Sequence, residues 1–170
     1  VKIRPALEKS SVPYIRDVLS LVEGFSGSSV TVGKINADGS APLSVTQYEK
    51  KTAFSSVPVW EPEKCGQCGE CALLCPRAAI RMNLLPDTPA KHMPKNFPMT
   101  SIKPRPISGK NITLQISVDD CIACGACTAV CPTSALSLTS VTPELKDTLR
   151  ENVAYFQKLP ATDALTLDVG

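Results

Sequence analysis

All eight cysteines of the 170-residue chain fall into two short runs that share one spacing. Each run reads C-x2-C-x2-C-x3-C, and a helix-stopping proline follows it directly. Three closely spaced thiolates on a loop, with a fourth about one helical turn further on, form the arrangement that holds a [4Fe–4S] cluster. The candidate ligands are Cys65, Cys68, Cys71 and Cys75 in the first run, and Cys121, Cys124, Cys127 and Cys131 in the second.

The fourth cysteine of each run points away from its own loop, and in two-cluster proteins of this kind it serves the other cluster. We therefore assign Cys131 to the cluster of the first triplet and Cys75 to the cluster of the second. Gly66, Gly69 and Gly125 let the loop backbone approach its cluster and take a positive φ where needed. Loop N–H groups directed at the cluster would stabilise its negative charge.

Two other uses of cysteine fit this spacing less well. Four disulfides would suit a secreted chain, but the sequence shows no signal peptide. Zinc sites are usually built from two separated C-x2-C pairs, which would leave the middle cysteine of each triplet unexplained. The runs therefore favour two iron–sulfur clusters. Eight thiolates committed to iron imply a reducing compartment, the cytoplasm or the interior of an organelle, rather than secretion.

An internal repeat surrounds the two runs, because residues 57–84 and 113–140 correspond at a fixed offset of 56 positions. Each half reads as strand, cluster loop, short helix and strand, with alternating apolar residues such as Ile80, Met82 and Leu84. This predicts an α+β fold, a ferredoxin-like module with pseudo-twofold symmetry in which two antiparallel β-hairpins cover the clusters. We expect the clusters to be shielded from water by Leu73, Leu74, Ile122, Ala123, Ala126 and Val130.

The segments that flank the repeat predict one helix on each side. Residues 1–11 give no structural signal, residues 12–23 read as a helix, and Val30–Ile35 reads as a short strand. The apolar face of the first helix is Ile15, Val18, Leu19 and Val22.

A second helix over 143–158 is capped by Thr142, with Pro143 in its first turn. Its apolar stripe is Leu145, Leu149, Val153 and Phe156. The predicted division is an N-terminal segment 1–56, a two-cluster domain 57–141, and a C-terminal helix and tail 142–170.

The insertion between the halves, 85–111, is rich in proline and carries five basic residues, with no acid between Asp87 and Asp119. Proline-rich chain is extended and semi-rigid. It is either a solvated loop or a basic surface that steers an acidic redox partner through Lys91, Lys95 and Lys103. His92, the single histidine, is expected to be exposed rather than a ligand.

Composition excludes several other classes of function. The net charge is only +2, so there is no electrostatic case for nucleic-acid binding. No apolar run reaches the roughly 18 residues that a membrane span needs. No paired carboxylates, Ser/His/Asp set or Gly-rich phosphate loop accompanies the cysteines, so the chain alone is not expected to be catalytic. It begins at Val1 rather than Met, as a fragment or a chain that has lost its initiator segment would.

Three stretches resemble, in order, the pyruvate:ferredoxin (2-oxoacid) oxidoreductase family. They are Val12-Pro-Tyr-Ile-Arg-Asp-Val-Leu, Ala37-Asp-Gly leading to Tyr48-Glu-Lys-Lys, and Val57-Pro-Val-Trp-Glu-Pro-Glu-Lys-Cys65. The second corresponds to the family's Glu-Lys-Arg segment, in which Lys51 replaces the arginine. The resemblance covers about residues 12–160. One departure is Cys131-Pro-Thr-Ser-Ala-Leu136, which follows the simple ferredoxin pattern.

The resemblance implies part of a larger enzyme. In that family, thiamine diphosphate and a third cluster belong to other domains, and this segment carries two further clusters of the electron path. Its partners would be those domains, with ferredoxin, flavodoxin or a reductase domain as acceptor. Two alternatives stay open: a standalone or subunit two-cluster carrier for another redox complex, and a structural or interaction module that keeps the scaffold with clusters or zinc only for folding.

Overall fold

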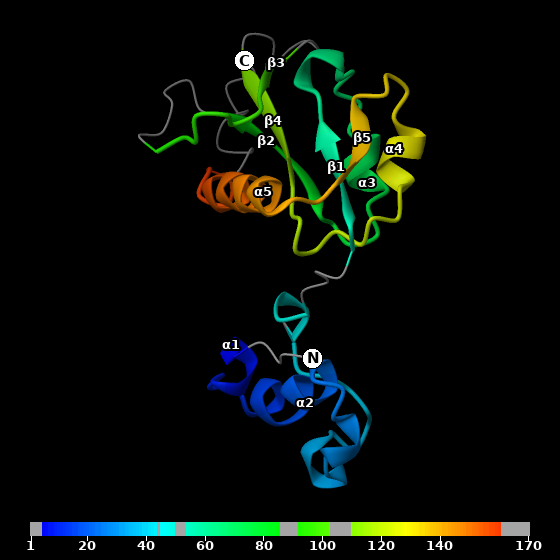
Figure 1. Cartoon of the computed structure of the whole chain (residues 1–170), viewed down its shortest axis with the longest axis vertical. Helices are drawn as coiled ribbons and strands as arrows, with labels where there is room; N and C mark the ends of the chain where they lie inside the picture. Colours follow the sequence, from blue (N-terminus) through cyan, green and yellow to red (C-terminus); the bar gives the residue numbers. More distant parts are fainter. Residues whose placement is uncertain (1–4, 44, 50–53, 86–91, 103–109, 161–170) are drawn as a thin grey trace, which may run out of the picture. The chain divides into compact units, whose positions relative to one another are not determined.

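The computed structural model describes residues 5–43, 45–49, 54–85, 92–102 and 110–160. The chain forms two compact units, an N-terminal unit Val1–Lys50 and a C-terminal unit Lys51–Gly170 (Figure 1). The Lys50–Lys51 pair of the Glu-Lys-Arg-like segment and the tail 161–170 lie outside the described residues.

The N-terminal unit is built from short helical turns. Its helices are α1 (Pro5–Glu8) and α2 (Ser20–Glu23), and a π-helical turn, Ile15–Leu19, runs directly into α2. Three 3-10 turns follow, at Gly27–Ser29, Val32–Lys34 and Val45–Gln47. Leu7, Ile15, Leu19 and Val45 form a small core.

Two sequence expectations for this unit are wrong, and residues 1–11, which gave no sequence signal, contain α1 with the buried Leu7. Val30–Ile35 is not a strand, since Val32–Lys34 is a 3-10 turn and Val32 is 87% exposed. Val22 does not complete the apolar face of the predicted helix and is 53% exposed. The π-helical turn explains this, because its wider i→i+5 bonding interrupts the 3.6-residue period.

The described residues of the C-terminal unit form five strands in two antiparallel sheets. One sheet pairs β1 (Ser56–Trp60) with β5 (Leu136–Ser140). The other has the order β2–β4–β3, with β2 at Ile80–Leu85, β4 at Asn111–Ile116 and the two-residue β3 at Thr100–Ser101. Each main ladder therefore joins a strand from one half of the repeat to a strand from the other.

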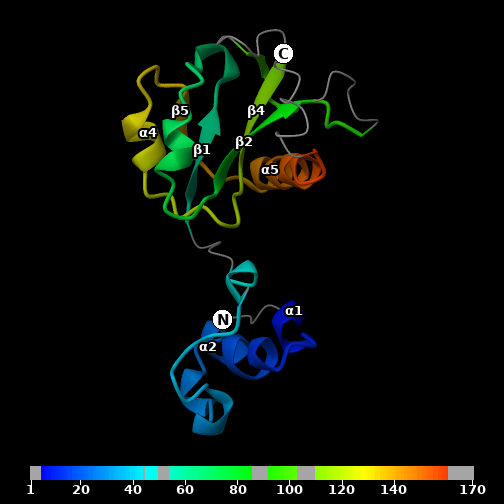
Figure 2. The same ribbon diagram turned by 180° about the vertical axis from the view of Figure 1, so that it is seen from behind.

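This pairing differs from the expected pair of hairpins. The two antiparallel ladders exist, but β1 and β5 are the first and last strands of the unit and are not joined by a turn. The reason lies in chain order, because each cluster loop separates the two strands of its own half. The short helices α3 (Glu70–Leu73) and α4 (Ala126–Val130) follow the loops and lie next to one another, on the opposite side of the unit from α5 (Figures 1 and 2).

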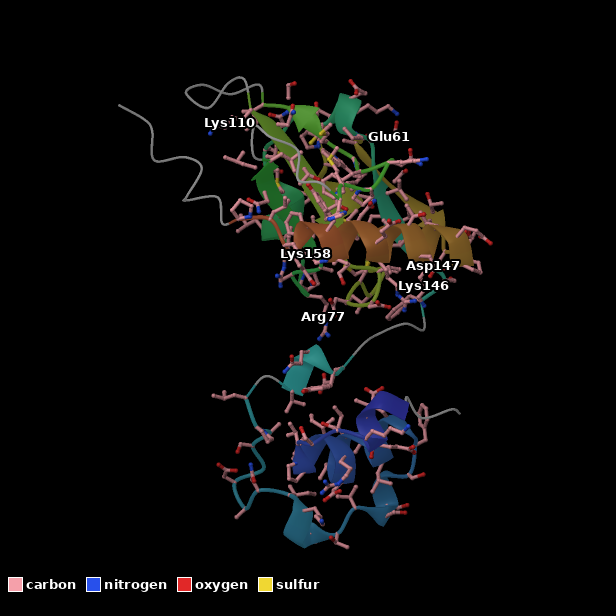
Figure 3. All side chains as sticks on the ribbon, turned by 90° about the vertical axis from the view of Figure 1, so that its left-hand side faces the viewer. Glu61, Arg77, Lys110, Lys146, Asp147 and Lys158 are labelled. Carbon is pink, nitrogen blue, oxygen red and sulfur yellow. The ribbon has the colours of Figure 1, made fainter. Side chains whose placement is uncertain are left out.

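The helix expected over 143–158 is α5, Pro143–Phe156, which packs across β4 (Figure 3). Its first turn is capped as expected, since the Thr142 hydroxyl accepts from the Leu145 N–H at 3.2 Å. The most buried residues of α5 are Asn152 and Tyr155, beside rather than on the predicted apolar stripe. That stripe left out Asn152 because the residue is polar.

Strand β4 is covered on both faces. Leu114 and Ile116 belong to the main core, which also contains Val57, Ile80 and Leu136. The alternate residues Thr113 and Gln115 are also buried, at 0% and 3% exposure, because they lie on the face that α5 covers. Gln115 Nε2 donates to Thr113 Oγ1 at 2.8 Å, and Thr113 Oγ1 donates to the Pro98 carbonyl at 2.7 Å, which satisfies these buried groups.

The insertion 85–111 is more than an extended cover. It provides β3, and Phe97 is buried against Tyr155 of α5 with ring centroids 4.8 Å apart in an edge-to-face arrangement. His92 is exposed, as expected. Of the three lysines considered for partner steering, Lys95 is exposed, whereas Lys91 and Lys103 lie outside the described residues. No helix in the described part of the chain is both long and apolar enough for a membrane crossing.

Candidate metal centres

The eight cysteines are free thiols that line two pockets. The pocket that we call the first is lined by Cys65, Cys68, Cys71 and Cys131. The second is lined by Cys121, Cys124, Cys127 and Cys75. Each pocket thus receives three cysteines from one run and the fourth from the other. The strand ladders account for this exchange, because β5 and β2, which follow the two fourth cysteines, pair with the strands that precede the opposite loops.

The two triplet loops have the same backbone geometry. Gly69 and Gly125 have φ of 78° and 77°, and the helices α3 and α4 begin directly after them. Gln67 and Ala123, two residues earlier, are also left-handed, with φ of 60° and 52°. Their N–H groups donate to the Sγ atoms of the preceding first cysteines, Cys65 and Cys121, at 3.4 Å in both loops.

A positive φ is found at Gly69 and Gly125, whereas Gly66, whose φ is not positive, lines the first pocket. The left-handed residue next to Gly66 is Gln67, and its counterpart is Ala123. Neither carries a sequence signal for this conformation, because non-glycine residues adopt it only where the surrounding structure imposes it.

The fourth cysteines also share one geometry. The Ala79 N–H donates to Cys75 Sγ and the Ala135 N–H donates to Cys131 Sγ, both at 3.2 Å. In each case the residue before the donor has a positive φ, 47° at Ala78 and 50° at Ser134. Four backbone N–H groups thus point at cysteine sulfur, two in each pocket, which suits thiolates that carry negative charge.

Burial opposes the thiolate form at several of these cysteines. It raises the pKa of Cys71 to about 11, and it also raises the pKa values of Cys121 and Cys127. At Cys131 burial acts in the same direction, but donation from the Ala135 N–H and the Thr133 hydroxyl outweighs it, and the pKa is lowered. Bound metal is what holds such buried sulfurs as thiolates, so metal binding and folding are coupled here.

The donor set fits iron–sulfur clusters. Each pocket offers four soft sulfur ligands on a loop and a helix end, with backbone N–H donors beside them. Within the described ranges, no three Cys, His, Asp or Glu side chains converge closely enough to share a single metal ion. The four cysteines of each set are spread around a pocket.

The shielding residues predicted from sequence are only partly those observed. Ile122, Ala123 and Ala126 line the second pocket. Leu73 and Leu74 line neither pocket and are 85% and 52% exposed, and Val130 lines neither pocket. These three residues do not shield the pockets because their positions, in or just after α3 and in α4, face away from the sulfurs.

Several lining residues were missed by the sequence analysis. The first pocket is also lined by Trp60, Glu70, Met82, Leu114 and Thr133, and the second by Pro58, Arg77, Ile80 and Leu138. The repeat relates most of these residues in pairs, because Leu114 lies 56 positions after Pro58, Leu138 after Met82, and Thr133 after Arg77. A residue expected to line one pocket therefore predicts a residue that lines the other.

Comparison with known proteins agrees with this chemistry. Residues 64–135 match the family described as "4Fe-4S dicluster domain". The chain is 32% identical over 174 residues to a putative pyruvate-flavodoxin oxidoreductase of Synechocystis sp., a match that covers 98% of this chain and 14% of that protein. It is 33% identical over 148 residues to the pyruvate:ferredoxin oxidoreductase of Moorella thermoacetica, covering 86% of this chain and 13% of that protein.

A third relative is the mitochondrial pyruvate dehydrogenase [NADP(+)] of Euglena gracilis, 28% identical over 160 residues, covering 92% of this chain and 9% of that protein. The chain thus spans about one-seventh or less of the length of the curated relatives that it matches. The C-terminal unit contains a ferredoxin-like domain of mixed helix and strand content for two [4Fe–4S] clusters, and nearly the whole chain is homologous to one segment of pyruvate-flavodoxin and pyruvate:ferredoxin oxidoreductases.

Proposed function

We propose that this chain is an electron-relay segment of a 2-oxoacid oxidoreductase and that electrons pass through its two [4Fe–4S] clusters. The observation that carries the proposal is the pair of pockets, each lined by four cysteine sulfurs. When bound, each cluster accepts and releases one electron; the chain supplies the ligands, the N–H donors and the apolar cover. One cluster is held by Cys65, Cys68, Cys71 and Cys131, and the other by Cys121, Cys124, Cys127 and Cys75.

The exchange of fourth ligands favours a relay over two independent sites. Each cluster is tied to both halves of the repeat, so the two clusters belong to one folded body. We propose that the halves are related by a pseudo-twofold axis. Three pairs of left-handed residues support it: Gln67 and Ala123, Gly69 and Gly125, and Ala78 and Ser134, each separated by 56 positions.

The rest of the presumed enzyme is expected to lie beyond this segment. The names of the relatives are those of pyruvate oxidoreductases that use flavodoxin, ferredoxin or NADP(+). We propose that thiamine diphosphate and a third cluster belong to other domains, that a ferredoxin, a flavodoxin or a reductase domain takes the electrons, and that the chain works in a reducing compartment. We further propose that the two-cluster domain occupies 57–141.

Anaerobic metal analysis joined to a redox titration tests this function. We expect about eight irons and eight sulfides per chain and two one-electron centres that are reduced by dithionite and reoxidised by an acceptor protein. Both centres should exchange electrons faster than the donor turns over. Zinc in place of iron, or clusters that take no electron, would contradict the relay and favour a scaffold role.

A further inference from the structure

Trp60, the only tryptophan in the chain, lines the first pocket. It is the last residue of β1, it belongs to the main core, and it is 7% exposed. Its indole Nε1 is buried and has no hydrogen-bond partner among the residues that the structure describes. The tryptophan is therefore fixed at the wall of the first pocket with an unused donor.

A buried donor without an acceptor is uncommon in folded proteins, because the group has lost its water and gained nothing in return. Indole Nε1 can only donate. The β1–β5 ladder, in which Trp60 pairs with Leu136, fixes the backbone of this residue, and burial in the main core holds its ring. The missing acceptor is thus to be sought in whatever fills the pocket.

The group that fills this pocket is rich in acceptors. Cysteine thiolates and inorganic sulfides all accept hydrogen bonds, and the four cysteines lie around the same pocket that Trp60 lines. We propose that Trp60 Nε1–H donates a hydrogen bond to a sulfur of the first-pocket cluster, which makes Trp60 a positioning and potential-setting residue for that cluster. This inference rests on the proposed function.

The second half of the repeat carries no indole at the corresponding position. The residue 56 positions after Trp60 is Ile116, the last residue of β4 and fully apolar. Hydrogen bonds to cluster sulfur stabilise the reduced, more negative state and so raise the reduction potential. Trp60 therefore raises the potential of one cluster only and adds to the electronic difference between the two centres.

The first test is a redox titration of the loaded chain followed by electron paramagnetic resonance, with wild type, Trp60→Phe and the matched control Ile116→Val. Trp60→Phe keeps an aromatic ring and removes the donor. We expect a lower midpoint potential for one of the two clusters in Trp60→Phe, and no change for either in Ile116→Val. Equal midpoints in wild type and Trp60→Phe would overturn the inference.

A second test needs no substitution. Because the chain has a single tryptophan, growth with indole-¹⁵N tryptophan labels only Trp60. Pulsed resonance of the reduced protein should then show ¹⁵N hyperfine coupling and an exchangeable proton on one cluster signal. If the wild-type chain holds two reducible clusters but shows no ¹⁵N coupling, the inference about Trp60 is wrong while the proposed function stands. A wild-type chain without reducible clusters would instead overturn the proposed function, and this inference with it.

Discussion

The two pockets are alike in backbone and different in side chains. In both, an N–H donates to the first cysteine at 3.4 Å and another to the fourth at 3.2 Å. Yet Glu70 lines the first pocket where Ala126 lines the second, and Arg77 lines the second where Thr133 lines the first. The comparison indicates that the shared loop backbone allows each pocket to bind a cluster, whereas the lining side chains make the properties of the two clusters differ.

The largest expected effect comes from breaking the exchange of fourth ligands. Cys131→Ser should disrupt the first-pocket cluster and lower the iron content by about half, since one of the four thiolate ligands of that cluster is lost. The double variant Cys65→Ser/Cys131→Ser should lose no more iron than Cys131→Ser alone. Cys65→Ser/Cys75→Ser should lose nearly all of it. Iron and sulfide analysis after anaerobic purification measures both.

The reverse pattern would refute the ligand assignment. If Cys65→Ser/Cys131→Ser lost both clusters and Cys65→Ser/Cys75→Ser lost one, each run would hold its own cluster.

The shared backbone predicts equal sensitivity at the two loop glycines. Gly69→Ala and Gly125→Ala each place a side chain at a φ near +78°, which costs about 1–2 kcal/mol. The added Cβ meets nothing closer than 4.0 Å at Gly69 and 3.9 Å at Gly125, so the strain lies in the backbone alone. Anaerobic thermal unfolding of the loaded chain should show similar losses.

Gly66→Ala is the matched control. Its φ is not positive, and its Cβ would meet Thr133 Cγ2 at 3.5 Å, an ordinary contact. A loss as large as that of Gly69→Ala would show that space around the loop, rather than its left-handed backbone, limits substitution.

The charged lining residues should shift the two potentials in opposite directions. Arg77→Gln removes a cation and should lower the potential of the second-pocket cluster, whereas Glu70→Gln removes an anion and should raise that of the first. A change of ~1 kcal/mol in differential stabilisation is about 40 mV for a one-electron couple. Redox titrations at low and high salt measure it, and the shifts should shrink with salt. If Arg77→Gln shifted the potential of the first-pocket cluster, or Glu70→Gln that of the second, the assignment of these residues to the pockets would be wrong.

The smallest expected effect is at the α5 contact with the second loop. Arg150 makes two hydrogen bonds to Asp119, at 2.9 and 2.7 Å, just before Cys121. Arg150 is 47% exposed, so Arg150→Ala should cost only about 0.2–1 kcal/mol of stability. Chemical denaturation measures it, with the exposed Glu151→Ala on the same helix as a control. A loss well above this range would mean that α5 holds the second loop through this ion pair.

The sequence predicted what depends on local spacing. The eight cysteines, the positive φ of Gly69 and Gly125, and the Thr142 cap are all set by residues within a few positions of one another. The placement of Cys131 at the pocket of the first triplet was also predicted, because in two-cluster proteins the fourth cysteine of such a run serves the other cluster.

What the sequence left out depends on packing between distant segments. The left-handed backbone at Gln67 and Ala78 could not be predicted, because neither position is a glycine. Gln115 is polar and yet buried, because α5 covers its face of β4 and Thr113 accepts its hydrogen bond. The placement of Trp60 at the first pocket follows from the β1–β5 ladder, which pairs the two ends of the unit.

The most direct test of a two-cluster relay is the resonance spectrum of the dithionite-reduced chain, compared with that of Cys131→Ser. Two clusters held in one folded body should give a broadened, spin-coupled signal in the wild type. Cys131→Ser should give the simple signal of one isolated cluster, with about half the spins. A wild-type spectrum that already shows a single uncoupled cluster, or none, would contradict the account.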